Sequence, residues 1–432
     1  MLQALTMRDF RYLWCARSVS ALGSWLLVIA IPAHVFQLTG KLLATGLTLV
    51  AEVLPAVLLG PVAGVLIDRW DRKRVMLAAE LFRAAAISLM LLATTEQSLW
   101  LIYVALVAES TGTLLFRPAA QAHIPVVVGT GSLLSSANSL NAFTDGTVRL
   151  VGPPAGAALL TLTRFQTLIW VDIASYLVSA AAILMTTRRP TPARDQVLTV
   201  RQVLDGLTDG LRVLRGLPVA LSLLPLTALF LAANASLSAL LVPFGVQQLG
   251  GSQQIGFVVS ALGVGFLLGA VVIRKLVDQT QPRYLLAASQ LTTAVAFFVL
   301  FSSTSLIVAL PAGVAIGLFG SMTLVTPQTT LQRVVPNQAL GRISAVFLTA
   351  EALATLIGAL IGPVLAENLS VYTAVAIASL LTAAGAIVGC ILVPLLPAAA
   401  VTRAARPDAG GRRATAAVPP MAARPVRTYR RL

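Results

Sequence analysis

The chain has 432 residues, of which 57% are hydrophobic and 11% are charged, and its mean hydropathy is +0.87. Because soluble domains carry about 25% charged residues, this composition excludes a water-soluble protein and predicts an integral membrane protein. The net charge of +15 would suggest a nucleic-acid partner in a soluble chain. Here basic residues at the cytoplasmic ends of membrane helices explain the charge, and we expect no nucleic-acid partner.

Twelve apolar segments follow one another along the chain, and each is long enough to cross a bilayer as a helix of about 20 residues. The first six are expected at 14–38, 43–67, 75–94, 98–116, 134–162 and 165–186. The second six are expected at 217–246, 253–277, 283–301, 305–328, 342–366 and 371–396. We therefore predict an all-α membrane protein in which the polar stretch 187–216 separates two sets of six helices.

The two halves of the chain resemble each other in sequence. IPAHVFQLTG at 31–40 matches VPFGVQQLGG at 242–251, and Gly152-Pro153 matches Gly362-Pro363 at nearly the same offset. Hydrophobicity alone would not place Gly and Pro in register, whereas many secondary transporters repeat one helical unit around a central site. We predict an N-terminal bundle at 1–186, a cytoplasmic central loop at 187–216, a C-terminal bundle at 217–397 and a disordered basic cytoplasmic tail at 398–432.

The basic residues set the expected orientation in the membrane. Cytoplasmic loops are enriched in Lys and Arg. With both termini in the cytoplasm, every Lys and Arg except Lys41, Arg164 and Arg149 lies at or near the inner face. We therefore expect a multi-pass protein of the cell inner membrane with both termini cytoplasmic.

A dense charge cluster separates the second and third predicted helices, where six of the seven residues from Asp68 to Arg74 are charged. The pattern G-x-x-x-D-R-x-x-R-[KR] resembles the corresponding loop signature of the major facilitator superfamily. Its members here are Gly64, Asp68, Arg69, Arg72 and Lys73. The run Phe116–Pro125 and the sequence SANSL at 136–140 are similar to the macrolide-efflux and siderophore-exporter branch of that superfamily. The resemblance covers almost the whole chain and implies the major facilitator fold, with twelve transmembrane helices in two pseudo-repeated six-helix bundles.

The charge cluster has two interpretations. Arg69, Arg72 and Lys73 are able to bind carboxylates or helix carbonyls of the facing half, which would make the motif a cytoplasmic latch that favours the outward-open state. Plain positive-inside anchoring would need the basic residues but has no use for Gly64 or Asp68. The second half carries a weaker version of the pattern at 270–283.

The fifth predicted helix carries glycine and proline in DGTVRLVGPPAGAAL at 145–159. Gly146, Gly152 and Gly156 are spaced for close approach of a neighbouring helix, and Pro153 is expected to kink the helix. The segment partly resembles the glycine-proline motif of antiporters in this superfamily. Ordinary close packing of membrane helices is the alternative.

Ionisable residues inside membrane helices are costly and usually functional. The candidates for proton or substrate coupling are Glu52, Glu109, Asp145, Arg149 and Glu351. Asp172 is a further acid within a predicted helix, and we expect it near the outer interface and partly hydrated because it follows Arg164 by only eight residues. Asp145 and Arg149 are four residues apart and share a helix face, so a neutralising pair is one possibility and a proton relay with Glu109 is the other. Glu80 and Arg83 are expected to pair within their own helix.

The superfamily's arginine motif is absent from the fourth predicted helix, where Glu109 stands instead. That departure weakens any transfer of a proton mechanism from other drug antiporters. The two histidines, His34 and His123, lie too far apart in the predicted topology to share a metal, and we expect no metal and no cofactor.

Two further function classes compete with transport. A membrane-embedded enzyme would need a cluster of catalytic groups at one depth, which two distant histidines do not provide. A static scaffold has no need of a latch or a kinked helix. Since no ATP-binding motif is present, we predict a non-enzymatic, monomeric secondary transporter that exports drug-like or natural-product small molecules in exchange for protons. A siderophore or lysophospholipid carrier of the same fold is the alternative.

The substrate cavity is expected to be apolar and suited to bulky, lipophilic solutes. Trp25, Phe36, Phe230, Phe244, Phe319 and Phe347 are the candidate lining residues, although packing between helices or contact with lipid is the more common role for any single one of them.

Overall fold

The protein was analysed as a computed structural model, which describes residues 2–129, 131–187 and 200–395. Within these ranges the chain forms helices and no strand. The predicted tail at 398–432 and most of the first half of the predicted central loop lie outside the described residues, as do the side chains of residues 61–69.

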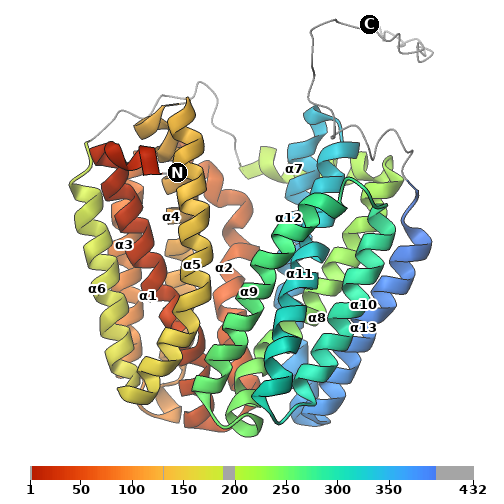
Figure 1. Ribbon diagram of the computed structural model, residues 1–432. Helices are drawn as coiled ribbons and strands as arrows, with labels where there is room; N and C mark the ends of the chain where they lie inside the picture. The colour runs from red at the N-terminus through yellow and green to blue at the C-terminus, as the bar shows by residue number, and fades with distance from the viewer. Residues whose placement is uncertain (1, 130, 188–199, 396–432) are drawn as a thin grey trace, which may run out of the picture.

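Six long helices form the first half of the molecule (Figure 1). They are α1 (Arg8–Thr39), α2 (Leu42–Arg69), α3 (Arg72–Ser88), α4 (Trp100–Val128), α5 (Ser132–Leu162) and α6 (Phe165–Leu184). Short 3₁₀ turns precede α1 (Leu2–Thr6), follow α3 (Leu89–Leu92) and precede α4 (Glu96–Ser98). Each of the six helices overlaps its predicted segment.

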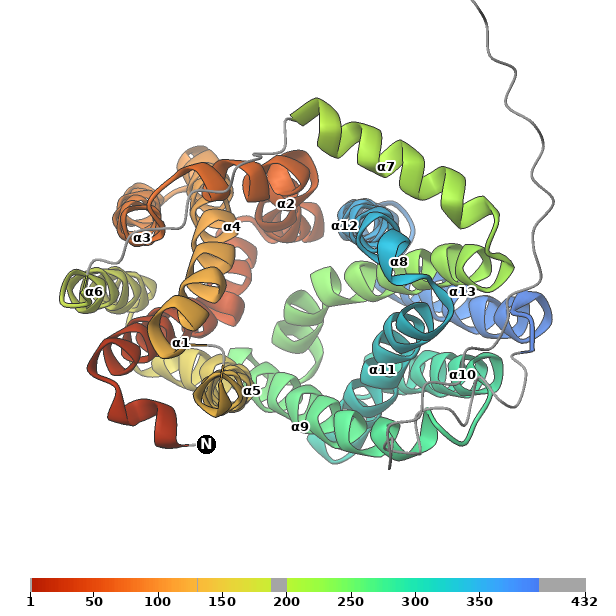
Figure 2. The same cartoon turned by 90° about the horizontal axis from the view of Figure 1, so that it is seen from above.

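Six further long helices form the second half. They are α8 (Pro218–Gln248), α9 (Ser252–Leu276), α10 (Pro282–Phe301), α11 (Leu306–Val334), α12 (Asn337–Asn368) and α13 (Val371–Leu392). Viewed along the helices, α1–α6 gather on one side and α8–α13 on the other, with α7 (Val200–Arg215) running across the end of the second group (Figure 2). The fold is thus the expected arrangement of two six-helix groups.

Eleven of the helices in the described part are long and apolar enough to cross a membrane. The remaining long helix, α5, is 31 residues long and lies among them. Its first half is rich in Ser and Asn and also carries Asp145 and Arg149, which lowers its hydropathy. Polar residues on a helix inside a membrane bundle indicate a face that is turned toward protein or water.

Two helices extend well beyond the ends of their predicted segments. The fourth predicted segment ended at residue 116 and the tenth at residue 328, whereas α4 continues to Val128 and α11 to Val334. Both extensions contain proline, at Pro118, Pro125 and Pro327. The predicted segments ended where the apolar residues end, but both helices continue into the more polar sequence that follows. His123 consequently lies buried within α4 rather than in a loop.

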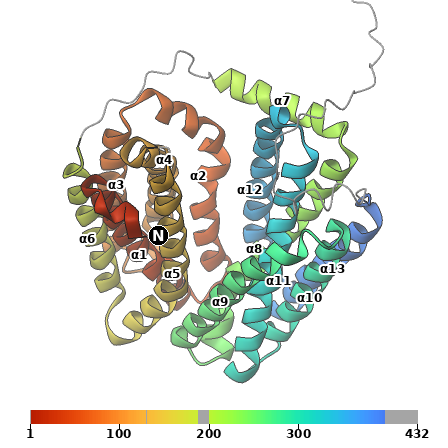
Figure 3. The same cartoon turned by 45° about the horizontal axis from the view of Figure 1, so that its top comes forward.

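The two ends of the molecule differ in how the bundles meet. We call the end at which the N-terminus, the α2–α3 turn and α7 lie the α7 face, and the opposite end the far face (Figure 1). Toward the far face one apolar cluster joins both bundles, since it contains Ile29 of α1 and Ala157 of α5 together with Leu237 of α8 and Val258 of α9. Toward the α7 face the clusters are separate for each bundle, and the helices diverge there (Figure 3).

Two glycine–proline contacts hold the bundles together near the far face. A Cβ at Gly46 of α2 would lie 2.2 Å from Cγ of Pro363 on α12, and a Cβ at Gly256 of α9 would lie 2.9 Å from Cα of Pro154 on α5. Gly46 and Gly256 are 210 residues apart, so the contacts follow the internal repeat. The carboxylate of Glu367 on α12 also accepts a hydrogen bond from the backbone N–H of Leu43 at 2.8 Å.

Candidate functional site

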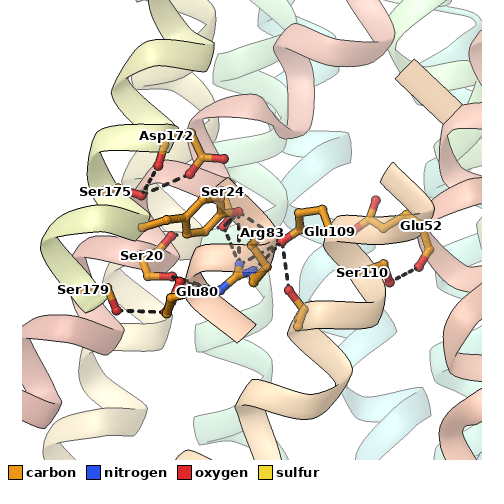
Figure 4. Close-up of polar contacts among 12 residues, drawn as sticks. Ser20, Ser24, Glu52, Glu80, Arg83, Glu109, Ser110, Asp172, Ser175 and Ser179 are labelled. Carbon is orange, nitrogen blue, oxygen red and sulfur yellow. Dashed lines mark hydrogen bonds and ion pairs between the residues drawn. The ribbon is translucent and has the colours of Figure 1, made fainter. Parts of the chain in front are cut away.

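A cluster of charged side chains lies inside the first bundle, centred on Arg83 of α3 (Figure 4). Only 5% of the Arg83 side chain is exposed. Its guanidinium donates hydrogen bonds to Glu109 of α4 at 2.9 Å and to Glu80 at 3.3 Å. It also donates to Ser20 at 3.0 Å, to Ser24 at 3.1 Å and to the hydroxyl of Tyr176 at 3.1 Å. Helices α1, α3, α4 and α6 all contribute to the cluster.

Two carboxylates share the single guanidinium of Arg83. Glu80 is fully buried and accepts hydrogen bonds from Ser179 at 2.8 Å and from Ser20 at 3.3 Å. Glu109 accepts from Thr113 at 2.8 Å and from Tyr176 at 3.0 Å, and 14% of its side chain remains exposed. The acids therefore outnumber the cation in a site that is almost dry.

Asp172 of α6 lies next to this cluster, one helical turn before Tyr176 (Figure 4). The residue is fully buried, and Ser175 donates a hydrogen bond of 3.1 Å to its Oδ1. Its Oδ2 has no partner among the described residues. Helix α1 approaches closely here because Gly23 has no side chain, and a Cβ at that position would lie 2.3 Å from Oδ1 of Asp172.

Glu109 and Asp172 were both candidates from the sequence, but the cluster that joins them was not predicted. The expected partial hydration of Asp172 was wrong, since the residue is fully buried beside Arg83 and Tyr176. Glu80 and Arg83 do pair within α3 as expected, at 3.3 Å. The available signal was the helical spacing of polar residues in apolar segments. Ser20 and Ser24, Glu109 and Thr113, and Asp172, Tyr176 and Ser179 each occupy one helix face. Spacing alone did not show that these faces turn toward each other.

Asp145 lies outside this cluster, on the wall of a hollow of about 440 Å³ formed by α1, α4 and α5. The lining residues are Arg17, Gln121, Ile124, Pro125, Leu134, Asn138, Asn141, Ala142 and Asp145. Asp145 forms an ion pair of 2.5 Å with Arg17 of α1. Trp14 supports the same wall by donating a hydrogen bond of 3.0 Å to Thr144.

Of the two possibilities for Asp145 and Arg149, the direct ion pair is not formed. Although the two residues share a face of α5, Asp145 pairs with Arg17, and the Arg149 guanidinium lies over two aromatic rings. Its central carbon is 5.2 Å from the ring centre of Trp25 on α1 and 5.5 Å from that of Phe266 on α9. Arg149 thus contacts both bundles, which intrahelical spacing could not predict.

The remaining ionisable candidates lie apart from one another. Glu52 of α2 is exposed, and it is attracted by the charge of Arg117 and repelled by that of Glu109, both on α4. Glu351 of α12 is half-buried in the opposite bundle. The proposed coupling residues therefore do not form one continuous chain.

Part of the predicted latch motif lies within the described residues. Gly64, Asp68 and Arg69 belong to α2, but their side chains lie outside the described part. Arg72 donates a hydrogen bond to the carbonyl of Ala122 on α4 at 2.7 Å, and Lys73 donates to the carbonyl of Leu184 at 2.9 Å. In this state both side chains thus bind carbonyls of their own bundle rather than groups of the facing half.

The second half contains an equivalent contact. Arg333 of α11 donates a hydrogen bond to the carbonyl of Val277 at 3.0 Å and forms an ion pair with Asp278 in the α9–α10 turn. The weaker charge pattern of the second half therefore also ties a turn to a neighbouring helix of the same bundle.

The glycines of α5 pack mainly against α1. A Cβ at Gly156 would lie 2.0 Å from the carbonyl oxygen of Leu26, and one at Gly152 would lie 2.5 Å from Cβ of Trp25. Gly146 instead faces Leu267 of α9. Pro153 is buried beside Gly152, and contact with α9 is made by the next residue, Pro154.

Most of the aromatic residues proposed to line the cavity have another role. Phe36, Phe230, Phe244 and Phe347 are buried, and the last two belong to apolar clusters of the second half. Which way each helix is rotated about its axis decides whether these side chains face the cavity or the interior of a bundle, and composition does not determine that rotation. Residues of the hollow that the sequence analysis did not identify, such as Asn138 and Asn141, are amides.

Neither histidine belongs to a metal site in the described part of the chain. The ring of His34 stacks on Phe165 with centroids 4.0 Å apart. Within the described residues, no group of three His, Cys, Asp or Glu side chains is placed to hold a metal ion.

Comparison with known sequences places this architecture among membrane transporters. A sequence family described as transmembrane secretion effectors (MFS_3) matches residues 2–409. The uncharacterised MFS-type transporter YfiS of Bacillus subtilis (strain 168) is 25% identical, over 84% of this chain and 88% of the relative. Macrolide efflux protein A of Streptococcus pyogenes is 25% identical, over 65% of this chain and 70% of the relative. The enterobactin exporter EntS of Escherichia coli O1:K1 / APEC is 28% identical, over 81% of this chain and 83% of the relative.

Solved structures of transporters have the same fold. The nucleoside transporter NupG matches with a TM-score of 0.75 at 11% identity, over 89% of this chain and 99% of that one. A bacterial homologue of the lysosomal transporter Spinster, solved in an inward-facing conformation, matches with a TM-score of 0.65 at 15% identity, over 92% of this chain and 96% of that one.

Proposed function

Because the chain belongs to the transmembrane secretion effector family of the major facilitator superfamily, we propose that it exports drug-like or natural-product small molecules in exchange for protons. The efflux relatives support export: macrolide efflux protein A, the multidrug efflux pump Tap of Mycolicibacterium fortuitum and the enterobactin exporter. The solute would bind between the bundles, which alternate between opening at one face of the membrane and at the other.

The excess of acid in the Arg83 cluster is the observation that supports proton coupling. With Glu80 and Glu109 both ionised, the cluster would carry a net negative charge in a nearly dry site. Since uncompensated charge inside a membrane protein is costly, one bound proton would neutralise it. Of the two acids only Glu109 keeps part of its side chain exposed, 14% against 0% for Glu80, so it is our candidate for the group that loads and releases the proton.

The other candidate residues receive separate roles in this proposal. Asp145 and Arg149 would shape the solute site and the contact between bundles, while Glu52 and Glu351 would lie along the path between them. The α7 face would be cytoplasmic, as the basic residues suggest, and the protein would be a monomer in the inner membrane. Arg72 and Lys73, together with Gly64, Asp68 and Arg69, would engage the facing half when that face closes.

The proposal is tested by the pH dependence of export in proteoliposomes that contain wild-type protein or the Glu109→Gln variant. We expect the wild type to export faster when the opposite side is acidified and the variant to lose this dependence, because an amide cannot carry the proton. Glu96→Gln is the matched control. Glu96 lies at the far face and pairs with Lys41 at 2.7 Å, and its hydrogen bond raises the pKa of that ammonium. A Glu109→Gln variant that kept the wild-type pH dependence would remove Glu109 from the proposal.

The second candidate function is a siderophore or lysophospholipid carrier of the same fold. The enterobactin exporter favours the siderophore version, since it matches 81% of this chain. A susceptibility panel of drugs and siderophores in an efflux-deficient host separates the two. Protection against drugs supports the first candidate, whereas siderophore secretion alone supports the second.

A further inference from the structure

The hollow between α1, α4 and α5 is lined by both polar and apolar side chains. It lies on the α7 side of the first bundle and has a volume of about 440 Å³. Small-molecule sites commonly have volumes of about 300–1,000 Å³. Its wall combines the apolar residues Ile124, Leu134 and Ala142 with three amides and one ion pair.

The three amides, Gln121, Asn138 and Asn141, have no hydrogen-bond partner among the described residues. Asn141 is only 6% exposed, and its amide lies in the wall of the hollow, where it is available to a bound solute. Asn138, Asn141 and Asp145 are spaced three and four residues apart, which places them on one face of α5.

The charges of the hollow are already balanced. Asp145 and Arg17 pair at 2.5 Å. A cationic solute would have to displace the guanidinium from Asp145, and an anionic solute would have to displace the carboxylate from Arg17. The hollow therefore offers a solute unpaired hydrogen-bonding groups but no unpaired charge.

We propose that the hollow binds an uncharged, hydroxyl-rich part of the solute, such as a sugar. Each amide offers both a donor and an acceptor, which matches the paired donor and acceptor character of a hydroxyl group. The apolar part of the wall takes the hydrophobic remainder of the solute. This inference rests on the proposed export function and names its solute class: neutral glycoside-like amphiphiles rather than the lipophilic cations that an apolar cavity would favour.

The test uses equilibrium binding to the full-length protein in nanodiscs, with no pH gradient. The probes share one coumarin ring that carries a glucose, a carboxylate or a trimethylammonium group. We expect the glucoside to bind most tightly. Asn141→Ala and Gln121→Ala should each weaken its binding about 3- to 10-fold, the equivalent of one neutral hydrogen bond. Ser139→Ala is the matched control, because Ser139 lies on α5 but does not line the hollow.

Three outcomes would overturn the proposal: no saturable binding of the glucoside, tighter binding of either charged probe, or unchanged glucoside affinity in both amide variants. The melting temperature of each variant shows whether it folds, and Gln121→Ala keeps the test valid because Gln121 is exposed. Since the assay contains no gradient, its failure leaves proton coupling untouched. Loss of proton coupling in Glu109→Gln likewise leaves the solute class untouched.

Discussion

Arg83 is the residue on which the charge cluster depends. Its guanidinium donates hydrogen bonds to five side chains, four of them on α1, α4 and α6 and one on its own helix. It also lies over the ring of Tyr176, with its central carbon 4.2 Å from the ring centre. Arg suits this position better than Lys because its planar guanidinium group has five N–H donors, which contact several acceptors at once.

We predict that Arg83→Gln destabilises the protein by about 3–5 kcal/mol, because removal of one partner leaves buried carboxylates without a counter-charge. Thermal unfolding in detergent or nanodiscs measures the loss. Arg74→Gln serves as the control, since Arg74 is exposed. The double variant Glu80→Gln/Arg83→Gln should recover part of the stability. Equal stability of Arg83→Gln and Arg74→Gln would show that the cluster does not need its cation.

Helix positions were predictable at the scale of the element because hydrophobic length is a strong signal. All twelve segments appear as helices, and the polar stretch between them contains the amphipathic helix α7. Helix rotation was not predictable, because contacts between helices depend on packing that one sequence does not reveal. For this reason the sequence did not predict the Arg83 cluster, nor that Asp145 pairs with Arg17 of α1 rather than with Arg149.

Helices α1 and α5 form a close contact that depends on glycine. Because a Cβ at Gly156 would meet the backbone of Leu26 at 2.0 Å, we predict that Gly156→Val forces the helices apart and lowers stability by about 1–3 kcal/mol. Gly60→Ala on α2 is the control, since nothing lies within 4 Å of a Cβ there. The midpoints of thermal unfolding of the Gly156→Val and Gly60→Ala variants measure the difference in stability. A Gly156→Val protein as stable as Gly60→Ala would refute the close contact.

At the scale of the whole molecule, the bundles meet at the far face and diverge at the α7 face. Gly46 packs against Pro363 where α2 meets α12. We predict that Gly46→Leu prevents this closure and shifts the population toward a state open at the far face. Spin labels at the far ends of α2 and α12 should then report longer distances than in the wild type. Unchanged distances would contradict the role of this contact.

The central claim is that solute export is coupled to proton entry through the Arg83 cluster. A pH indicator trapped with the solute inside proteoliposomes tests it most directly, because solute loss and internal pH are followed together. The account predicts that solute exit is accompanied by internal acidification in the wild type and that Glu109→Gln uncouples the two. Solute exit from wild-type vesicles with no change in internal pH would contradict it.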